Sequence, residues 1–306
     1  MARITRPKLV LSINPLYKCN LNCPFCYLGS LKNNTNILDL TYLTETLNQV
    51  SMRYDLHTID IYGGEVSLLS NFYFDFLVRL CKTFSRNVNI TTNFVDFNES
   101  LINNFDTITV SLDFNNFREK QDIVYNNIKA AAESGKVINA LSLDISCQKN
   151  QEEIIETLNK LKVKSWRLIP YSKSKETKME FKGYQFFENT VKEFIKLNDK
   201  MNFSFINKLE LDGIINEDYY NTTHFYITPN NKVALLKFDN NEEYFQEFDL
   251  LDDLYEDLKN EQLMQDNYCK KCSVKNKCLA EHFNYEYKGE SCSGLKNLIM
   301  DYKNDN

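Results

Sequence analysis

Long apolar runs, an N-terminal signal segment and an excess of positive charge are all missing from this 306-residue sequence. No run of apolar residues approaches the roughly 20 that a helix needs to span a bilayer, and the N-terminus lacks the apolar core of a signal peptide. The formal net charge of −6 disfavours nucleic acid as the main partner, since such partners usually need a basic surface. Glycine (8) and proline (5) are also scarce, which we interpret as genome bias without functional meaning. We therefore expect a soluble, cytoplasmic protein with neither a membrane nor a nucleic-acid partner.

Three cysteines lie within eight residues, in the segment Cys19-Asn20-Leu21-Asn22-Cys23-Pro24-Phe25-Cys26. Three cysteines cannot form two disulfides, the total of nine is odd, and the cytoplasm keeps thiols reduced. A zinc site needs four ligands, or three and a water, and Cys-x3-Cys-x2-Cys is not a usual zinc spacing. Iron–sulfur cubanes are usually held by four thiolates, so three cysteines leave one iron open to another ligand.

Six short runs with β-strand character alternate with helical patterns over the first two-thirds of the chain, at 9–14, 58–62, 88–93, 107–113, 140–146 and 165–170. Apolar residues at helical spacing occupy 40–50, 76–84 and 154–161, and Asn150 is a predicted N-cap for the last of these helices. Repeated strand–helix units predict an α/β fold with a parallel sheet and right-handed crossovers.

Each predicted strand has one polar face, unlike the strands of an ordinary α/β core, which are apolar on both faces. At 140–146 the alternation predicts Ser142, Asp144 and Ser146 in the interior, with Leu143 and Ile145 under the helices. A closed eight-stranded barrel fills its interior with branched apolar side chains. Polar inner faces therefore favour an open barrel with room for ligand and water.

The cysteine segment resembles the cluster loop of the radical S-adenosylmethionine (SAM) enzymes. In that family the open iron chelates the methionine end of SAM, and an electron from the [4Fe–4S] cluster splits SAM to release a 5′-deoxyadenosyl radical. The resemblance implies that Cys19, Cys23 and Cys26 hold such a cluster, in a partial (β/α)6 TIM-like barrel over residues 7–200. It also implies an electron donor such as flavodoxin or ferredoxin.

Further motifs support the resemblance and imply contacts with SAM. Gly63-Gly64-Glu65 follows the second predicted strand. In the family, a Gly-Gly-Glu segment at this place bonds the methionyl ammonium of SAM, so the resemblance implies the same role for these three residues. The resemblance also implies that the adenine of SAM is contacted by Phe25 and Tyr27. Its ribose and carboxylate would be contacted by Asn93, Ser111 and Arg118. Ordinary loop packing is the alternative for the two aromatic residues. One departure is Phe114, which stands where the family often has a glycine after Ser-Leu-Asp.

Two charged residues on the predicted inner face are candidate catalytic residues, Asp144 and Arg167. A carboxylate in a radical cavity can orient a substrate or take a proton, and a solvated side chain is the alternative for Asp144. Arg167 lies between Trp166 and Leu168 in the sixth predicted strand, which places its side chain on the polar face.

Four more cysteines lie near the end of the chain, as Cys269-x2-Cys272-x5-Cys278 and Cys292. A predicted hairpin (224–238) and a helix with leucines at helical spacing precede them. The pattern resembles the SPASM and Twitch auxiliary-cluster domains, which implies a small α+β cysteine-rich domain over residues 220–300 with a second [4Fe–4S] cluster. A structural zinc site is the alternative. The segment departs from the full SPASM pattern at Asn231 and Leu236, and it lacks a cysteine three residues after Cys278, so a second auxiliary cluster is not expected.

The combined patterns predict a radical SAM enzyme that modifies a peptide or protein side chain, with a ribosomally synthesised precursor peptide as the expected substrate. The reaction would be a crosslink, epimerisation, oxidation or fragmentation. The alternatives are radical SAM chemistry on a small metabolite and a non-catalytic, metal-stabilised binding module. Because the first predicted strand starts near residue 9, we expect no winged-helix peptide-binding domain before it.

Overall fold

The computed structural model describes residues 6–148, 150–171, 176–180, 182–215, 223–236, 245–268, 274 and 296–305, with the backbone alone at 260–268 and 305. The strands in this part of the chain are β1 (Lys8–Ile13), β2 (Asp55–Ile61), β3 (Val88–Thr92), β4 (Thr107–Ser111), β5 (Val137–Leu143), β6 (Ser165–Ile169), β7 (Ser204–Phe205), β8 (Thr223–Thr228), β9 (Lys232–Leu236) and β10 (Phe245–Phe248). The α-helices are α1 (Leu40–Arg53), α2 (Asn71–Phe84), α3 (Glu99–Asn104), α4 (Gln121–Glu133), α5 (Gln151–Lys160), α6 (Tyr184–Lys196), α7 (Ile206–Ile215), α8 (Leu251–Tyr268) and α9 (Lys296–Asp305).

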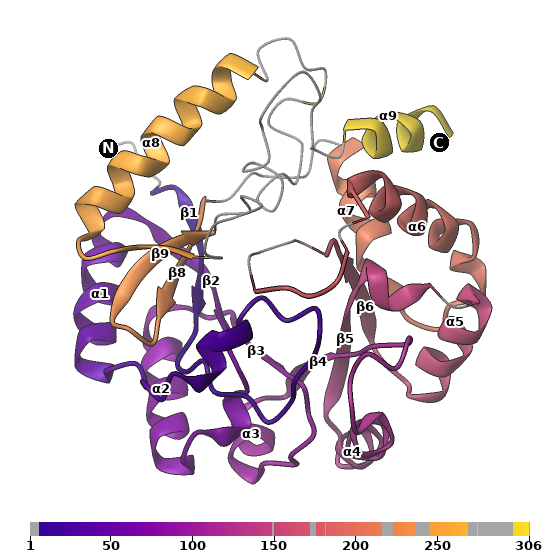
Figure 1. The fold of residues 1–306 in the computed structure, drawn as a ribbon, viewed down its shortest axis with the longest axis horizontal. Helices are drawn as coiled ribbons and strands as arrows, with labels where there is room; N and C mark the ends of the chain where they lie inside the picture. The colour runs from indigo at the N-terminus through magenta and orange to yellow at the C-terminus, as the bar shows by residue number, and fades with distance from the viewer. Residues whose placement is uncertain are drawn as a thin grey trace.

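All the described strands form one open sheet, in the order β10-β9-β8-β1-β2-β3-β4-β5-β6-β7. The strands from β8 through β1 to β7 run parallel, while β9 and β10 are antiparallel to their neighbours. Helices α1 to α6 surround the curved sheet from outside (Figure 1). The predicted α/β fold with a partial barrel is confirmed.

The predicted hairpin is present as β8 and β9, joined by a turn in which Asn231 has a φ of 58°. β8 also pairs in parallel with β1, with Leu9 opposite Thr223 and Ile13 opposite Ile227. The hairpin therefore continues the barrel sheet. The division into domains at residues 7–200 and 220–300 remains a prediction, although one sheet runs through both segments.

The predicted helices form where a polar side chain caps their first turn. The Asp39 carboxylate accepts the backbone N–H of Thr41 at 2.6 Å at the start of α1, and Asn150 caps α5 as expected. The buried face of α2 consists of Phe74, Leu77, Val78 and Cys81, whereas Phe76, at the start of the predicted apolar range, is 51% exposed.

The polar inner face is confirmed for the first four strands. The register places Ser12 opposite Asp60 and Asp60 opposite Asn89, whose amide donates to the Asp60 carboxylate at 2.8 Å. The outward-facing residues of these strands, such as Leu11 and Ile59, are fully buried in the main core under the helices.

On β5 the predicted phase is wrong. Ser142 pairs with Leu168, and its hydroxyl accepts the indole N–H of the buried Trp166 at 3.1 Å, so Ser142 faces the helix layer. Leu143 and Ile145 instead pack against Phe25 of the cysteine loop. Within the strand, the outward position of Ser142 is stabilised by its hydrogen bond to the buried Trp166 indole. Beyond the strand, β5 ends at Leu143 and a 3-10 helix follows, so strand alternation does not extend to residues 144–146.

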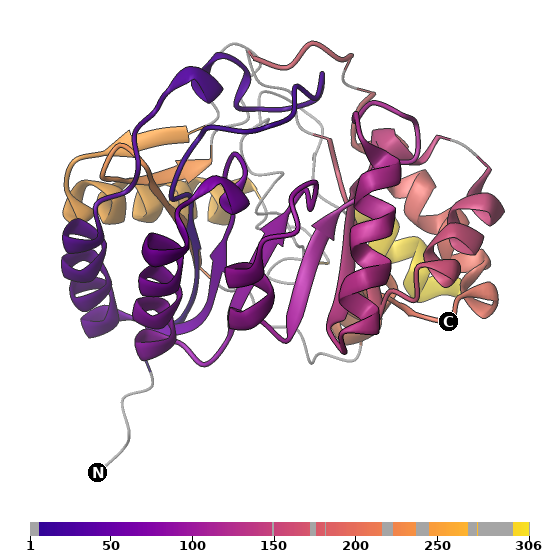
Figure 2. The same cartoon turned by 90° about the horizontal axis from the view of Figure 1, so that it is seen from below.

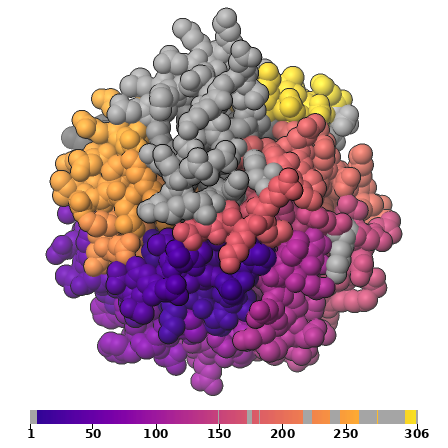
Figure 3. Space-filling view, in the orientation of Figure 1, coloured from indigo at the N-terminus to yellow at the C-terminus, as the bar shows by residue number. Residues whose placement is uncertain are grey.

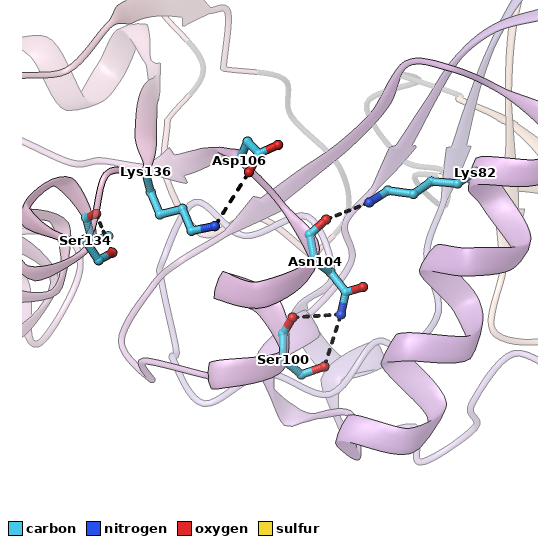
Figure 4. A network of polar contacts seen from close by, with 7 residues as sticks. Lys82, Ser100, Asn104, Asp106, Ser134 and Lys136 are labelled. Carbon is cyan, nitrogen blue, oxygen red and sulfur yellow. Dashed lines mark hydrogen bonds and ion pairs between the residues drawn. The ribbon is translucent and has the colours of Figure 1, made fainter.

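Polar contacts stabilise the segments that lead into β4 and β5, at the end of the barrel away from the cysteine loop (Figures 2 and 4). Lys82 of α2 donates to the carbonyl of Asn104 at 2.7 Å, and the Asn104 amide donates to Ser100 O at 2.9 Å. Lys136, just before β5, forms an ion pair with Asp106 at 3.7 Å. No helix in the described ranges is long and apolar enough to cross a membrane.

Candidate functional site

The three N-terminal cysteines lie on the loop between β1 and α1, over the carboxyl ends of the parallel strands (Figure 2). An antiparallel bridge between Leu16 and Ile37 closes the base of this loop. The Cys26 N–H donates to the Cys23 carbonyl at 3.2 Å, which makes a tight turn around the last two cysteines. Cys19, Cys23 and Cys26 are free thiols and half-buried.

The surroundings of Cys19 and Cys23 disfavour ionisation of their thiols without a cation. The pKa of Cys23 is raised to about 11, mainly by burial, with the positive charge of Arg118 acting in the opposite direction and the nearby Cys26 and Cys19 adding to the increase. The pKa of Cys19 is also raised, first by burial. A positively charged metal centre would offset both effects, because the thiolate is the form that binds metal.

The arrangement suits a cluster better than a single ion. Among the described residues, no three His, Cys, Asp or Glu side chains are grouped closely enough to hold one metal ion. A cubane binds each thiolate through a different iron, so its ligands need not converge on one point. Three free thiols on one loop fit that requirement.

Gly63 and Gly64 lie directly against the backbone of the cysteine loop. A Cβ atom at Gly64 would lie 2.1 Å from the carbonyl oxygen of Lys18 and 2.2 Å from that of Tyr17. The Gly64 N–H donates to Leu16 O at 2.9 Å, and the Glu65 N–H donates to Lys18 O at 2.9 Å. The glycines are thus required by close packing, and the two predicted motifs form one unit.

The Glu65 carboxylate is buried and accepts hydrogen bonds from three donors around the end of β3. These are the Thr92 hydroxyl at 2.6 Å, the Asn93 N–H at 2.7 Å and the Ser67 N–H at 3.0 Å. Burial raises the pKa of Glu65, and these hydrogen bonds act in the opposite direction. The side chain therefore joins the β2 turn to β3, while the carbonyl oxygens of Gly63 and Gly64 accept no hydrogen bond from any described residue.

Asn93 connects this unit to a cysteine. Its amide Nδ2 lies 3.7 Å from Cys19 Sγ and donates to Asn20 Oδ1 at 2.7 Å. Asn20 in turn donates to Asp96 at 2.7 Å. The predicted site residues Cys19, Glu65 and Asn93 are therefore in contact.

A second group of predicted residues meets at the end of β4. Arg118 donates to the carbonyl oxygen of Ser111 at 2.7 Å, and its guanidinium lies 5.4 Å from the ring centre of Phe25. The buried Asp113 carboxylate holds this turn by accepting the Arg118 N–H at 3.0 Å. Cys23 packs against the same cluster of side chains as Phe25.

The other predicted aromatic residue, Tyr27, packs against a different cluster of side chains from that of Phe25. Its ring packs edge-on against Phe245 of β10, at 5.9 Å between ring centres. Its hydroxyl lies 3.5 Å from Asn14 Oδ1. Asn14 is fully buried, and its Nδ2 has no hydrogen-bond partner among the described residues.

Of the two candidate catalytic residues, Asp144 is buried beside the Phe25 cluster. Its Oδ1 accepts the N–H groups of Ile145 at 2.7 Å and Tyr171 at 2.8 Å. Burial raises the pKa of Asp144 to about 6. Arg167 lies apart from this group and forms an ion pair with Glu210 of α7.

Residues 176–180 cover the cysteine loop, and sequence reasoning did not predict this contact. The Lys178 N–H donates to Pro24 O at 3.1 Å, and the Glu176 carboxylate accepts both the backbone N–H and the hydroxyl of Ser30. The two segments lie side by side on the surface (Figure 3). Between them is a pocket of about 370 Å³, to which Cys23 and Cys26 contribute. Because Glu176 and Ser30 are 146 positions apart in the chain, no local sequence pattern predicts their contact.

The C-terminal cysteines Cys269, Cys272, Cys278 and Cys292 lie outside the described residues. Their metal remains a prediction. α8, which precedes them, is present where a helix is predicted.

Residues 13–162 match the family model of the Radical SAM superfamily. This part of the chain, just under half of its length, therefore resembles a radical SAM domain. Enzymes with this domain use a [4Fe–4S] cluster and SAM. No curated protein matches the chain.

Several solved structures have a similar fold. Native anSMEcpe with bound AdoMet and the Cp18Cys peptide gives a TM-score of 0.71 at 15% identity, over 98% of this chain and 97% of that one. SuiB from Streptococcus suis bound to S-adenosylmethionine gives 0.65 at 20% identity, over 92% and 73%. SuiB bound to its precursor peptide SuiA gives 0.56 at 21% identity, over 75% of this chain and 59% of that chain.

Proposed function

We propose that this protein is a radical SAM enzyme that modifies a side chain of a peptide or protein, and that Cys19, Cys23 and Cys26 hold its SAM-binding cluster. The observation that carries the proposal is the packing of the cysteine loop on Gly63 and Gly64 within a radical SAM domain. When bound, the cluster supplies the electron that cleaves SAM to a 5′-deoxyadenosyl radical.

The residues of the chain position and enclose the reactants. The carbonyl oxygens of Gly63 and Gly64, which accept no hydrogen bond within the described part of the chain, are suited to accept hydrogen bonds from the SAM ammonium. Phe25 offers a buried ring for the adenine, and Arg118 offers a cation for the carboxylate. The buried Asp144 carboxylate has one oxygen, Oδ2, that accepts no hydrogen bond from the described residues and is the candidate proton acceptor.

A peptide substrate is supported by the similar structures, since SuiB was solved with its precursor peptide and anSMEcpe with a peptide. A ribosomally synthesised precursor is the substrate we favour. We also propose that Cys269, Cys272, Cys278 and Cys292 hold an auxiliary [4Fe–4S] cluster that relays an electron or binds substrate. A flavodoxin or ferredoxin is the proposed electron donor.

The test is SAM cleavage by protein reconstituted with iron and sulfide under anaerobic conditions. With dithionite, the wild type should convert SAM to 5′-deoxyadenosine, and the variant with alanine at Cys19, Cys23 and Cys26 should not. Cys81→Ala is the matched control, because this buried thiol lies in α2 away from the loop. Deoxyadenosine formation that persists in the triple variant would overturn the proposal.

The substrate class is tested separately, with peptides encoded by genes beside this one. A precursor peptide should increase deoxyadenosine formation and change its own mass. If only a small metabolite has this effect, the peptide assignment is wrong and the radical SAM assignment stands.

A further inference from the structure

Two polar side chains from different parts of the sheet approach the cysteine loop. The first is Asn93, which follows β3 and is 8% exposed. Its Oδ1 accepts the N–H of Val95 at 3.0 Å, which fixes the orientation of the amide. In this orientation Nδ2 is within donor distance of Asn20 Oδ1 and Cys19 Sγ, at 2.7 and 3.7 Å.

The second side chain is Arg118, which brings a positive charge to Cys23. Its Nε is buried without a hydrogen-bond partner, and no carboxylate of the described residues forms an ion pair with it. Its guanidinium lies 5.4 Å from the ring centre of Phe25, and Cys23 packs against the cluster of side chains that contains Phe25.

Both contacts favour negative charge on the sulfur atoms. The potential of an iron–sulfur cluster depends on hydrogen bonds to its sulfurs, its net charge and its exposure to solvent. Reduction adds one negative charge, which a nearby N–H donor and a guanidinium cation stabilise. This effect requires no SAM.

We propose that Asn93 and Arg118 raise the reduction potential of the cluster held by Cys19, Cys23 and Cys26. Asn93 acts through an N–H···S hydrogen bond to Cys19, and Arg118 through its charge beside Cys23. In the step concerned, the cluster gains one electron from an external reductant such as dithionite, and no bond is made or broken. The inference rests on the proposed function.

The test is a redox titration of the reconstituted protein without SAM, monitored by electron paramagnetic resonance. A parallel sample with SAM identifies the titrated signal as the one that SAM perturbs. Arg118→Met and Asn93→Ala should each lower the midpoint potential. At the wild-type midpoint potential, the ratio of reduced to oxidised cluster in each variant should be about tenfold lower than in the wild type. For a one-electron couple, this corresponds to a midpoint potential lower by about 59 mV. Arg118→Lys should keep most of the wild-type potential.

Two controls make the result specific. Arg53→Gln removes one positive charge from α1, where Arg53 pairs with Asp252, and should leave the potential unchanged. If Asn93→Ala does not fold, Asn93→Asp keeps an acceptor for the Val95 N–H but removes the donor to Cys19, and it should also lower the potential.

The outcomes separate the inference from the proposed function. Midpoints equal to that of the wild type in Arg118→Met and Asn93→Ala without SAM would overturn the inference. A difference that arises only when SAM is present would also overturn it, because Arg118 or Asn93 would then act as a SAM ligand alone. A wild type that binds no cluster through Cys19, Cys23 and Cys26 would overturn the proposed function itself.

Discussion

Gly64 has no room for a side chain, because the carbonyl oxygens of Tyr17 and Lys18 would lie within 2.2 Å of its Cβ. In Gly64→Ala the cysteine loop must move away from β2. We expect a loss of about 2 kcal/mol in unfolding free energy, as for an overpacked core, and less than half of the wild-type iron after reconstitution. Calorimetry and iron analysis measure the two effects.

The matched control is Gly213→Ala. Gly213 lies in α7, and a Cβ there would meet nothing within 4 Å. Its replacement should change stability little, or raise it by about 0.5–1 kcal/mol through helix propensity. A Gly64→Ala protein that loads iron as well as Gly213→Ala would refute the close-packing argument.

The buried Asp144 should make the stability of the folded protein depend on pH. Burial raises its pKa from 3.8 to about 6, so the folded state keeps this proton to higher pH than the unfolded state. The unfolding free energy should therefore fall as pH rises from 4 through 6, by about 3 kcal/mol in total at 1.36 kcal/mol per pKa unit.

Asp144→Asn should remove this dependence. The new side chain keeps an oxygen for the N–H groups of Ile145 and Tyr171 but cannot ionise. In urea unfolding of the metal-free protein, the variant should match the wild type near pH 4 and exceed it at pH 8. The same pH slope in both proteins would show that Asp144 is not the group responsible.

At this scale the sequence predicts motifs better than contacts. The cysteines and Gly63-Gly64-Glu65 are recognisable because their chemistry lies within a few consecutive residues. The contacts of Asn93 with Cys19 and of Glu176 with Ser30 join residues 74 and 146 positions apart. Such pairs follow from the fold and have no local pattern.

At the scale of elements, strands and helices are predictable where periodicity is long and the cap is clear, as in α1 and α5. β5 shows why the rest is not. Its polar residues alternate with apolar ones, which predicts a polar inner face. Ser142 instead accepts a hydrogen bond from the Trp166 indole under the helices, and the strand ends before Asp144. The pattern alone cannot locate that end or the partner.

The edge of the sheet at β6 depends on α7. Because β7 is only two residues long, the amide of Asn207 continues its pairing, donating to Leu168 O at 2.9 Å and accepting the Leu168 N–H at 2.8 Å. Asn207→Ala should leave both backbone groups buried without partners and cost about 2 kcal/mol. Asn48→Ala, at an exposed site on α1, should change the unfolding free energy by less than about 0.5 kcal/mol. Equal urea midpoints for the two variants would contradict this role for Asn207.

At the scale of the whole molecule, the hairpin β8–β9 joins the barrel sheet through β1, although the sequence pattern places it in a separate segment. Composition changes after residue 200, but strand pairing across more than 200 positions has no signature in a single sequence. The same sheet thus connects the cysteine loop to the chain that leads to the C-terminal cysteines.

We expect about eight irons per chain, from two cubanes of four irons each. Replacing Cys269 and Cys272 with alanine should remove half of this iron and leave the SAM-perturbed resonance of the N-terminal cluster intact. Metal analysis of protein purified without air measures both metals. A wild type with about four irons and one zinc would exclude a second iron–sulfur cluster and leave the proposed radical chemistry in place.

Direct binding of SAM to the cluster held by Cys19, Cys23 and Cys26 can be measured by electron–nuclear double resonance of the reduced protein, using SAM labelled at its amino nitrogen and carboxylate carbon. The open iron should give hyperfine coupling to both labels, and the triple alanine variant should lack the signal. A reduced cluster in the wild type whose resonance is unchanged by SAM, with no coupling to either label, would contradict the proposed site.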